Sequence, residues 1–137
     1  RRRSSIVETA RVLSALVKQH VRTLAFCRTR KLTELVLKYC TEDLECSAPH
    51  LVEAVKGYRG GYTKGDRREI EGKLFSGKLL GVTATSALEL GIDLGDLDVT
   101  IHLGYPGSVS SLWQQAGRAG RGGRNSLAIL IMFDSPL

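Results

Sequence analysis

Hydrophobic positions along the chain follow two different periods. In some stretches an apolar residue returns every three or four positions, as on one side of an α-helix, and between them lie short runs that are apolar nearly throughout. Some helical stretches begin at a hydroxyl residue with an acidic residue three positions later, which is a capping signal. The pattern predicts helices over 5–17, 29–40, 63–76, 86–90 and 108–115, strands over 21–27, 79–84, 97–103 and 127–133, and a loop over 41–49, and it leaves 51–55 undecided. The residues expected to face inward from the first three helices are Ile6, Ala10, Leu13 and Val17, then Leu32, Leu35, Val36 and Tyr39, then Ile70, Leu74 and Phe75.

Strands that are separated by helices predict a fold of the α/β class, with a parallel β-sheet and helices on both of its faces. The predicted strands are near-continuous apolar runs, as expected when both faces of a sheet are buried. In such sheets ligands bind beyond the carboxyl ends of the strands. We therefore expect functional residues in the loops 28–31, 58–63, 85–93 and 104–108, and in 117–124 after a helix.

Composition and charge narrow the classes of partner. The 137 residues suit one domain, and 20 Lys and Arg against 14 Asp and Glu give a net charge of +6, which favours an anionic partner. The apolar runs are too short to span a bilayer, and no signal peptide precedes the first helix, so we expect no membrane partner. Three cysteines lack the spacing of metal pairs. Cys27 lies in an apolar run and is predicted to be a buried, reduced thiol, which favours a reducing compartment.

Three of the selected loops carry residues that suit phosphate groups, and each also fits a purely structural role. Arg28-Thr29-Arg30-Lys31 places three cations and a hydroxyl at a helix start, where N–H groups attract anions, but a solvated helix start looks the same. Tyr58-Arg59-Gly60-Gly61-Tyr62 suits a nucleic-acid backbone and a stacked base, or an ordinary turn with one tyrosine in the core. Thr83-Ala-Thr85-Ser86 and Gly91-Ile-Asp93 offer hydroxyls for a phosphate and a carboxylate for a sugar, or simply a capped helix.

The segment 114–124, with the sequence QQAGRAGRGGR, places arginines three residues apart among glycines and alanines. Such a segment is either a disordered nucleic-acid-binding tail or a fixed turn. Because an apolar helix end precedes it and the apolar run 127–133 follows it, we expect a turn that is held at both ends. Arg118 and Arg121 would then be fixed cations, as arginine fingers are. The role of Arg124 stays open.

In chain order these loops resemble the motifs of the second RecA-like domain of superfamily 2 helicases. Residues 26–31 resemble motif IV, 82–93 resemble motif V, and 114–121 resemble motif VI, which has the form Gln-x-x-Gly-Arg-x-Gly-Arg. The resemblance spans nearly all of the chain. The segments 58–62 and 66–71 are similar to the RecQ-like subfamily that includes bacterial mitomycin-repair helicases and their fungal and plant relatives.

This resemblance implies a RecA-like sheet that works with ATP and Mg²⁺. It assigns Arg121 as the arginine finger and places Arg118 beside the γ-phosphate as well. Gln114 matches the residue that couples ATP to nucleic acid. Gly91 and Asp93 match the positions that lie by the ribose and the γ-phosphate.

The resemblance also implies contacts to a single-stranded nucleic acid, with DNA favoured over RNA. Thr85 matches the motif V threonine that contacts a phosphate. Arg28 and Thr29 fall where motif IV approaches the backbone of the strand. Arg59 and Gly60 match a further segment that grips the backbone.

The motifs of the other half of such a motor are missing. The sequence contains no Gly-x-x-x-x-Gly-Lys-Ser/Thr and no Asp-Glu-x-x box. The resemblance implies that the parts that bind adenine, hold Mg²⁺ and activate water belong to the first RecA-like domain. We therefore expect residues 1–137 to be a single C-terminal domain from a longer helicase, and to be inactive toward ATP on its own. The resemblance implies 3′-to-5′ movement on DNA, in repair, and we expect a nuclear location. A non-catalytic nucleic-acid-binding module and an α/β protein without a ligand are the alternatives.

Overall fold

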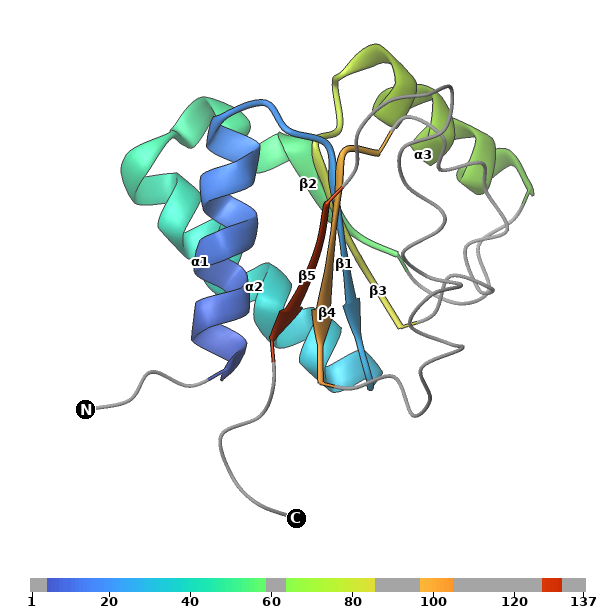
Figure 1. Cartoon of the computed structure of the whole chain (residues 1–137). Helices are drawn as coiled ribbons and strands as arrows, with labels where there is room; N and C mark the ends of the chain where they lie inside the picture. Colours follow the sequence, from blue (N-terminus) through green and yellow to red (C-terminus); the bar gives the residue numbers. More distant parts are fainter. Residues whose placement is uncertain (1–4, 59–63, 86–96, 105–126, 132–137) are drawn as a thin grey trace.

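The computed structural model describes residues 5–58, 64–85, 97–104 and 127–131. These residues form α1 (Ser5–Lys18), β1 (Thr23–Cys27), α2 (Arg30–Ser47), the 3₁₀ helix η1 (Pro49–Ala54), β2 (Val55–Gly57), α3 (Lys64–Ser76), β3 (Gly81–Ala84), β4 (Val99–Leu103) and β5 (Leu127–Ile131). The strands build one sheet in the order β2-β3-β1-β4-β5, and every neighbouring pair is parallel. Figure 1 shows α1 and α2 on one face of the sheet and α3 on the other. The predicted α/β class is therefore confirmed.

The central strand shows why the predicted strands are nearly continuous apolar runs. All five residues of β1 are buried, and successive side chains point to opposite faces. Ala25 and Cys27 belong to the core that α1 and α2 cover. Leu24 and Phe26 belong to the core that α3 covers. Because neither face of this strand meets solvent, no polar residue alternates with the apolar ones.

Helix α2 continues through most of 41–49, so the predicted loop in that region is wrong. Cys40 and Leu44 are both fully buried and extend the apolar row of the helix into the supposed loop. The hydroxyl of Thr41 donates to the carbonyl of Leu37 (2.8 Å), so this polar residue is satisfied within the helix. The polar composition of the segment therefore reflects its solvent-facing side.

The inward side of α2 also differs from the predicted one. Val36 is fully buried as expected, and Leu32 packs against the core. Tyr39, however, is 36% exposed, whereas its neighbour Cys40 is fully buried. Tyr39 is therefore a surface residue, because the row that contacts the core continues one position further along the helix.

The undecided segment 51–55 contains the last four residues of η1 and the first residue of β2. Strand β2 has three residues, which is too short for a period of two to appear in the sequence. Helix α3 confirms the expected burial of Ile70 and Leu74. The side chain of Phe75 and the predicted helices 86–90 and 108–115 lie outside the described residues. Among the helices that are described, none has the length and apolar character needed to cross a membrane.

Candidate nucleic-acid interface

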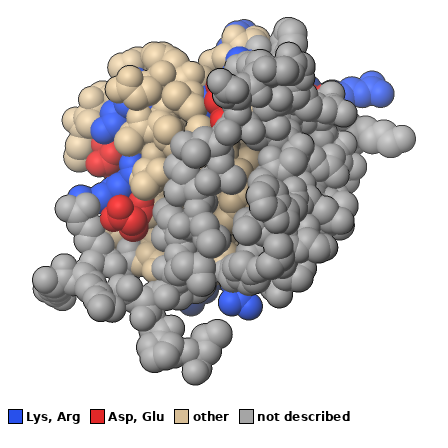
Figure 2. Space-filling model, viewed as in Figure 1, with Lys and Arg blue, Asp and Glu red and all other residues tan. Residues whose placement is uncertain are grey.

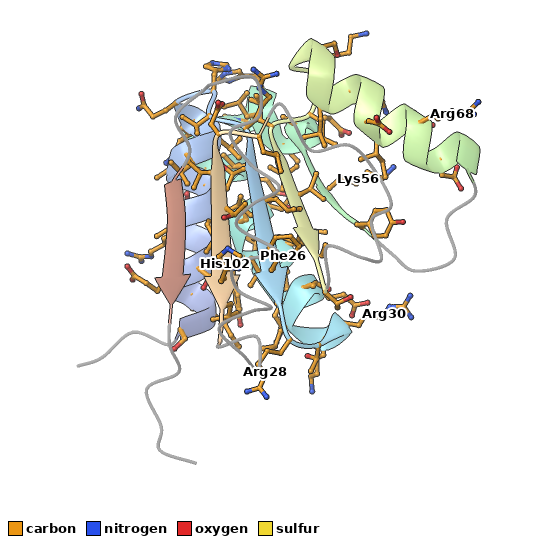
Figure 3. The ribbon with its side chains drawn as sticks, turned by 45° about the vertical axis from the view of Figure 1, so that its right-hand side comes forward. Phe26, Arg28, Arg30, Lys56, Arg68 and His102 are labelled. Atoms are coloured by element: carbon orange, nitrogen blue, oxygen red, sulfur yellow. The ribbon has the colours of Figure 1, made fainter. Side chains whose placement is uncertain are left out.

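The end of β1 turns directly into α2 through Arg28 and Thr29. Thr29 has an extended backbone (φ −132°, ψ 158°), and its hydroxyl accepts the N–H of Leu32 at 3.1 Å, so it caps the helix. Arg28 and Thr29 are both exposed. Figure 3 shows Arg28 and Arg30 at the same end of the sheet. The cap fixes this turn, and the Thr29 hydroxyl keeps its own proton to donate to an anion.

Thr85 lies beside this turn because β3 and β1 are neighbours in the sheet. The register pairs Phe26 of β1 with Ala84 of β3, so the two strands end within one residue of each other. Thr85, which follows Ala84, is half-buried. The structure thus brings the predicted contacts Arg28, Thr29 and Thr85 to one edge of the sheet.

The third predicted segment follows β2, the strand on the other side of β3. Gly57 pairs with Thr83, and the N–H of Tyr58 donates to the Thr83 carbonyl at 2.8 Å. Tyr58 is 5% exposed and packs into the core beneath α3, as expected for an ordinary turn with one tyrosine in the core. Arg59 and Gly60 come directly after it and lie outside the described residues.

The residues that the resemblance assigns to ATP follow β3 and β4 in the sequence. Strand β4 is followed by Gly104, which has a positive φ of 74° that favours glycine. The nucleotide-side residues lie outside the described residues, so their roles stay predictions: Gly91, Asp93, Gln114, Arg118 and Arg121.

A cavity of about 250 Å³ lies between α2 and the edge strand β2. Its lining includes cations, a carboxylate, two hydroxyls and an aliphatic side chain, which are Arg30, Lys56, Glu34, Thr33, Thr83 and Leu37. Thr83 is fully buried, and among the described residues its hydroxyl has no hydrogen-bond partner. Sequence reasoning missed Lys56 and the inward role of Thr83. The one available signal was a hydroxyl residue inside the otherwise apolar run 79–84.

A histidine that sequence reasoning also missed lies on β4. His102 is 1% exposed, and its ring stacks on that of Phe26, with centroids 5.3 Å apart and planes at 25°. The Nε2 atom of His102 lies 2.9 Å from the hydroxyl of Thr100. Figure 3 shows the two rings next to each other on neighbouring strands. The pair joins the strand that leads to Arg28 with the strand that leads to Gly104.

The cysteines are not placed for nucleophilic chemistry. Burial raises the pKa of Cys27 to about 12, and burial, with the nearby negative charge of Asp43, raises the pKa of Cys40 to about 12. Both thiols therefore stay protonated at neutral pH, which confirms the prediction of a buried thiol at Cys27. Within the described part of the chain, no group of His, Cys, Asp and Glu could hold a metal ion.

The surface over α1 and α2 carries charges of both signs, unlike the end of β1, where the exposed charged side chains are cations. Figure 2 shows basic and acidic side chains next to one another over α1 and α2. One such pair is Lys18 and Asp43, whose Nζ and Oδ2 atoms are 3.5 Å apart. A surface of mixed sign attracts a polyanion weakly. Among the described residues, the exposed cations at the end of β1 are therefore better candidates for a phosphate contact than those over α1 and α2.

Comparison with known proteins gives the chain a family and several relatives. Residues 7–123 match the helicase conserved C-terminal domain. The ATP-dependent helicase hrq1 of Schizosaccharomyces pombe is 43% identical over 137 residues, which are 99% of this chain and 13% of that protein. The uncharacterized ATP-dependent helicase YprA of Bacillus subtilis is 43% identical over 136 residues, which are 99% of this chain and 18% of that protein. The chain thus spans less than a fifth of either relative.

Solved structures agree with this placement. The DUF1998 helicase MrfA bound to DNA matches with a TM-score of 0.84 and 44% identity, over 98% of this chain and 18% of that chain. The C-terminal domain of the DEAD-box protein Dbp5 matches with a TM-score of 0.68 at 19% identity, over 93% of this chain and 71% of that chain, and this likeness concerns the fold alone. The predicted RecA-like sheet is confirmed. The chain belongs to the helicase C-terminal domain family, and within it to the group of superfamily 2 helicases that contains hrq1 and MrfA.

Proposed function

We propose that the chain is the C-terminal motor half of an ATP-dependent DNA helicase. One observation carries the proposal: β1 and β3 end within one residue of each other and gather Arg28, Thr29 and Thr85 at the carboxyl end of the sheet, where parallel sheets bind their ligands. A single strand of DNA crosses this edge, and its phosphates meet the guanidinium of Arg28 and the two hydroxyls. Arg59 and Gly60 continue the same track after β2.

The ATP site forms between this domain and a first RecA-like domain of the same longer protein. That domain supplies the phosphate-binding loop and most of the Mg²⁺ ligands. Arg121 acts as the arginine finger and Arg118 faces the γ-phosphate, where a fixed guanidinium accelerates phosphoryl transfer by about 10³–10⁵-fold. The named relatives support this, since MrfA, 43% identical, has been solved with DNA and AMPPNP together.

The remaining nucleotide contacts couple the two ligands. Gly91 and Asp93 lie on the ribose and γ-phosphate side, and Gln114 connects ATP binding to the strand. Opening and closing of the two domains then moves the protein along one strand in the 3′-to-5′ direction. A role in DNA repair and a nuclear location complete the proposal, and both rest on the similarity of 58–62 and 66–71 to the mitomycin-repair group and its fungal and plant relatives.

The finger is tested in the full-length protein by Arg121→Ala. DNA-stimulated ATP turnover should fall by about 10³-fold or more, while single-strand binding is kept, because the finger contacts the nucleotide alone. Lys78→Ala is a matched control, since Lys78 is an exposed cation that precedes β3 at the opposite end of the sheet. Unchanged turnover in Arg121→Ala would refute the finger assignment.

The strand track is tested by Arg28→Ala in the same protein. Affinity for single-stranded DNA should fall, and the slope of log affinity against log salt should become shallower by about 0.7, as expected when one phosphate contact is lost. Lys78→Ala should leave the slope unchanged. If Arg28→Ala weakens binding but the full-length wild-type protein hydrolyses no ATP, the chain is a nucleic-acid-binding module without a motor.

A further inference from the structure

We propose that the cavity between α2 and β2 takes one nucleobase of the bound single strand. The inference rests on the proposed function, because the strand must first cross the edge of the sheet. It goes beyond that function, because the contacts proposed for Arg28, Thr29, Thr85, Arg59 and Gly60 all reach the backbone of the strand.

The residues that line the cavity are close in sequence to the predicted backbone contacts. Arg30, which lines it, follows Thr29 directly, and Thr83 lies two residues before Thr85. The lining residue Tyr58 directly precedes Arg59. A strand gripped at these points therefore passes close to the cavity, and the base of one nucleotide is within reach of it.

The lining suits a base better than it suits a phosphate alone. Leu37 gives the cavity an aliphatic wall, and Glu34 places a carboxylate beside it that would repel an anion. The same carboxylate can accept a hydrogen bond from an exocyclic amine, as acidic side chains do from cytosine. Arg30 and Lys56 add cations that can hold the phosphates on either side of the base. With about 250 Å³, the cavity is smaller than the sites that hold drug-sized ligands, and a single heterocycle matches it.

Thr83 supplies the observation that points to a ligand. Its side chain is fully buried, yet within the described residues its hydroxyl lacks a hydrogen-bond partner. Buried polar groups are normally paired, because an unpaired hydroxyl loses its bonds to water without replacing them. A base in the cavity offers both a donor and an acceptor to this hydroxyl.

Gly57 keeps the space in front of this hydroxyl open. A Cβ atom at Gly57 would lie 3.4 Å from Thr83 Oγ1 and 3.1 Å from Leu37 Cδ2. Any side chain there would fill the gap between the aliphatic wall and the hydroxyl. The absence of a side chain at this position of β2 thus leaves the two parts of the cavity connected.

The test is a walk of abasic sites through a tailed duplex, bound to the full-length protein. The junction of the duplex fixes the register, and each DNA carries one abasic nucleotide at a different position of the single-stranded tail. One position should weaken binding by about 2–10-fold, as expected when one or two hydrogen bonds are lost. In Thr83→Val an abasic nucleotide at that position should no longer weaken binding. In Thr83→Ser, which keeps the hydroxyl, it should still weaken binding.

Stability separates this role from a structural one. Thr83→Val replaces an unpartnered hydroxyl with a methyl group of similar size, so its melting temperature should equal or exceed that of the wild type. The proposal is supported if Thr83→Val is stable and its binding no longer depends on whether a base is present at that position of the tail. In Gly57→Ala, which narrows the cavity, an abasic nucleotide at the same position should also no longer weaken binding.

Three outcomes would overturn the proposal. An abasic walk without any sensitive position excludes a bound base. A sensitive position that persists in Thr83→Val places the base elsewhere on the protein. Sensitivity to an uncharged methylphosphonate linkage but to no abasic site shows that the cavity takes a phosphate instead. Failure of the wild-type protein to bind the unmodified DNA would be a different result, because it refutes the proposed function itself and the base site with it.

Discussion

The rings of Phe26 and His102 stack across two neighbouring strands, with their centroids 5.3 Å apart. The two residues are partners in the parallel register of β1 and β4. They lie close to the carboxyl ends of both strands, each two residues before Arg28 or Gly104. The contact therefore fixes, from within the core, the position of β1, which leads to Arg28, relative to β4, which leads to Gly104.

The strength of this contact can be measured with a double-mutant cycle. Phe26→Leu and His102→Leu should each lower the free energy of unfolding, and their effects should differ from additivity by about 0.5–1.5 kcal/mol, as is typical of buried ring pairs. Urea unfolding of the wild type, both single variants and the double variant gives the coupling. Strictly additive effects would mean that the rings pack without a specific interaction.

The side of α2 that faces the core predicts how two substitutions in this helix change stability, one at Leu44 and one at Tyr39. Leu44 is fully buried, and its replacement with alanine should cost about 2–5 kcal/mol of stability. Tyr39 is 36% exposed, and Tyr39→Ala should stay within about 0.5 kcal/mol of the wild type. Denaturant unfolding of the two variants compares them directly. A larger loss of stability for Tyr39→Ala than for Leu44→Ala would mean that Tyr39 faces the core, as the sequence pattern predicted.

The parts of the fold that follow from burial on both faces of the sheet could be predicted from the sequence. Strand β1 is apolar at all but one of its positions because α1 and α2 cover one side and α3 the other. A short apolar run of this kind, between two stretches of helical period, is typical of a strand buried on both faces. The predicted burial of Leu13 and Val17 in α1 and of Ile70 and Leu74 in α3 is confirmed, because these residues repeat at helical spacing on the side that faces the core.

The prediction failed where a long helix carries polar residues on most of its surface. In the last part of α2, Cys40 and Leu44 are the residues that contact the core, and the residues between them are mainly polar. Two apolar positions four residues apart are too few to reveal a helical period. Strand β2 was missed because three residues show no alternation, and the cavity that Lys56 lines could not be predicted without that strand.

The thiols predict a clear order of chemical modification. Cys46 is exposed, whereas Cys27 and Cys40 are buried and have pKa values of about 12. Because the thiolate is the reactive form, iodoacetamide at pH 8 should modify Cys46 in the native protein and leave the other two intact. Mass spectrometry of the digested protein identifies the modified sites. All three should react after unfolding in guanidinium chloride, and native modification of Cys27 would contradict its burial in the sheet.

The interface between α1 and α2 predicts a dependence of stability on acid. Asp43 accepts a hydrogen bond from the hydroxyl of Ser14, and this bond, with the nearby charge of Lys18, lowers the pKa of the Asp43 carboxyl. A carboxyl whose pKa is lower in the folded state stabilises the protein above its unfolded pKa, about 3.9, and loses that contribution as the pH falls through the folded value. The stability of Ser14→Ala should therefore fall less steeply than that of the wild type below about pH 4. Unfolding curves at pH 7 and in this acid range measure the difference, and parallel acid dependence in both proteins would contradict it.

The cap of α2 allows the structural and the functional roles of Thr29 to be separated. Its hydroxyl accepts the N–H of Leu32, and Thr29→Ala should cost about 1 kcal/mol of stability through the lost cap. Asparagine and aspartate are both good caps, so Thr29→Asn and Thr29→Asp should both remain close to the wild type in stability. Only the aspartate places a negative charge where we propose that a DNA phosphate lies.

The two substitutions should therefore differ in DNA binding although they agree in stability. Thr29→Asp should weaken binding of single-stranded DNA by the full-length protein several-fold more than Thr29→Asn does, and the difference should shrink as salt is added, because salt screens the repulsion. Fluorescence anisotropy at two salt concentrations, together with thermal unfolding of both variants, measures each part. Equal DNA affinities of the two variants would mean that no phosphate approaches Thr29, and the track across the sheet edge would then have to be placed on Arg28 and Thr85 alone.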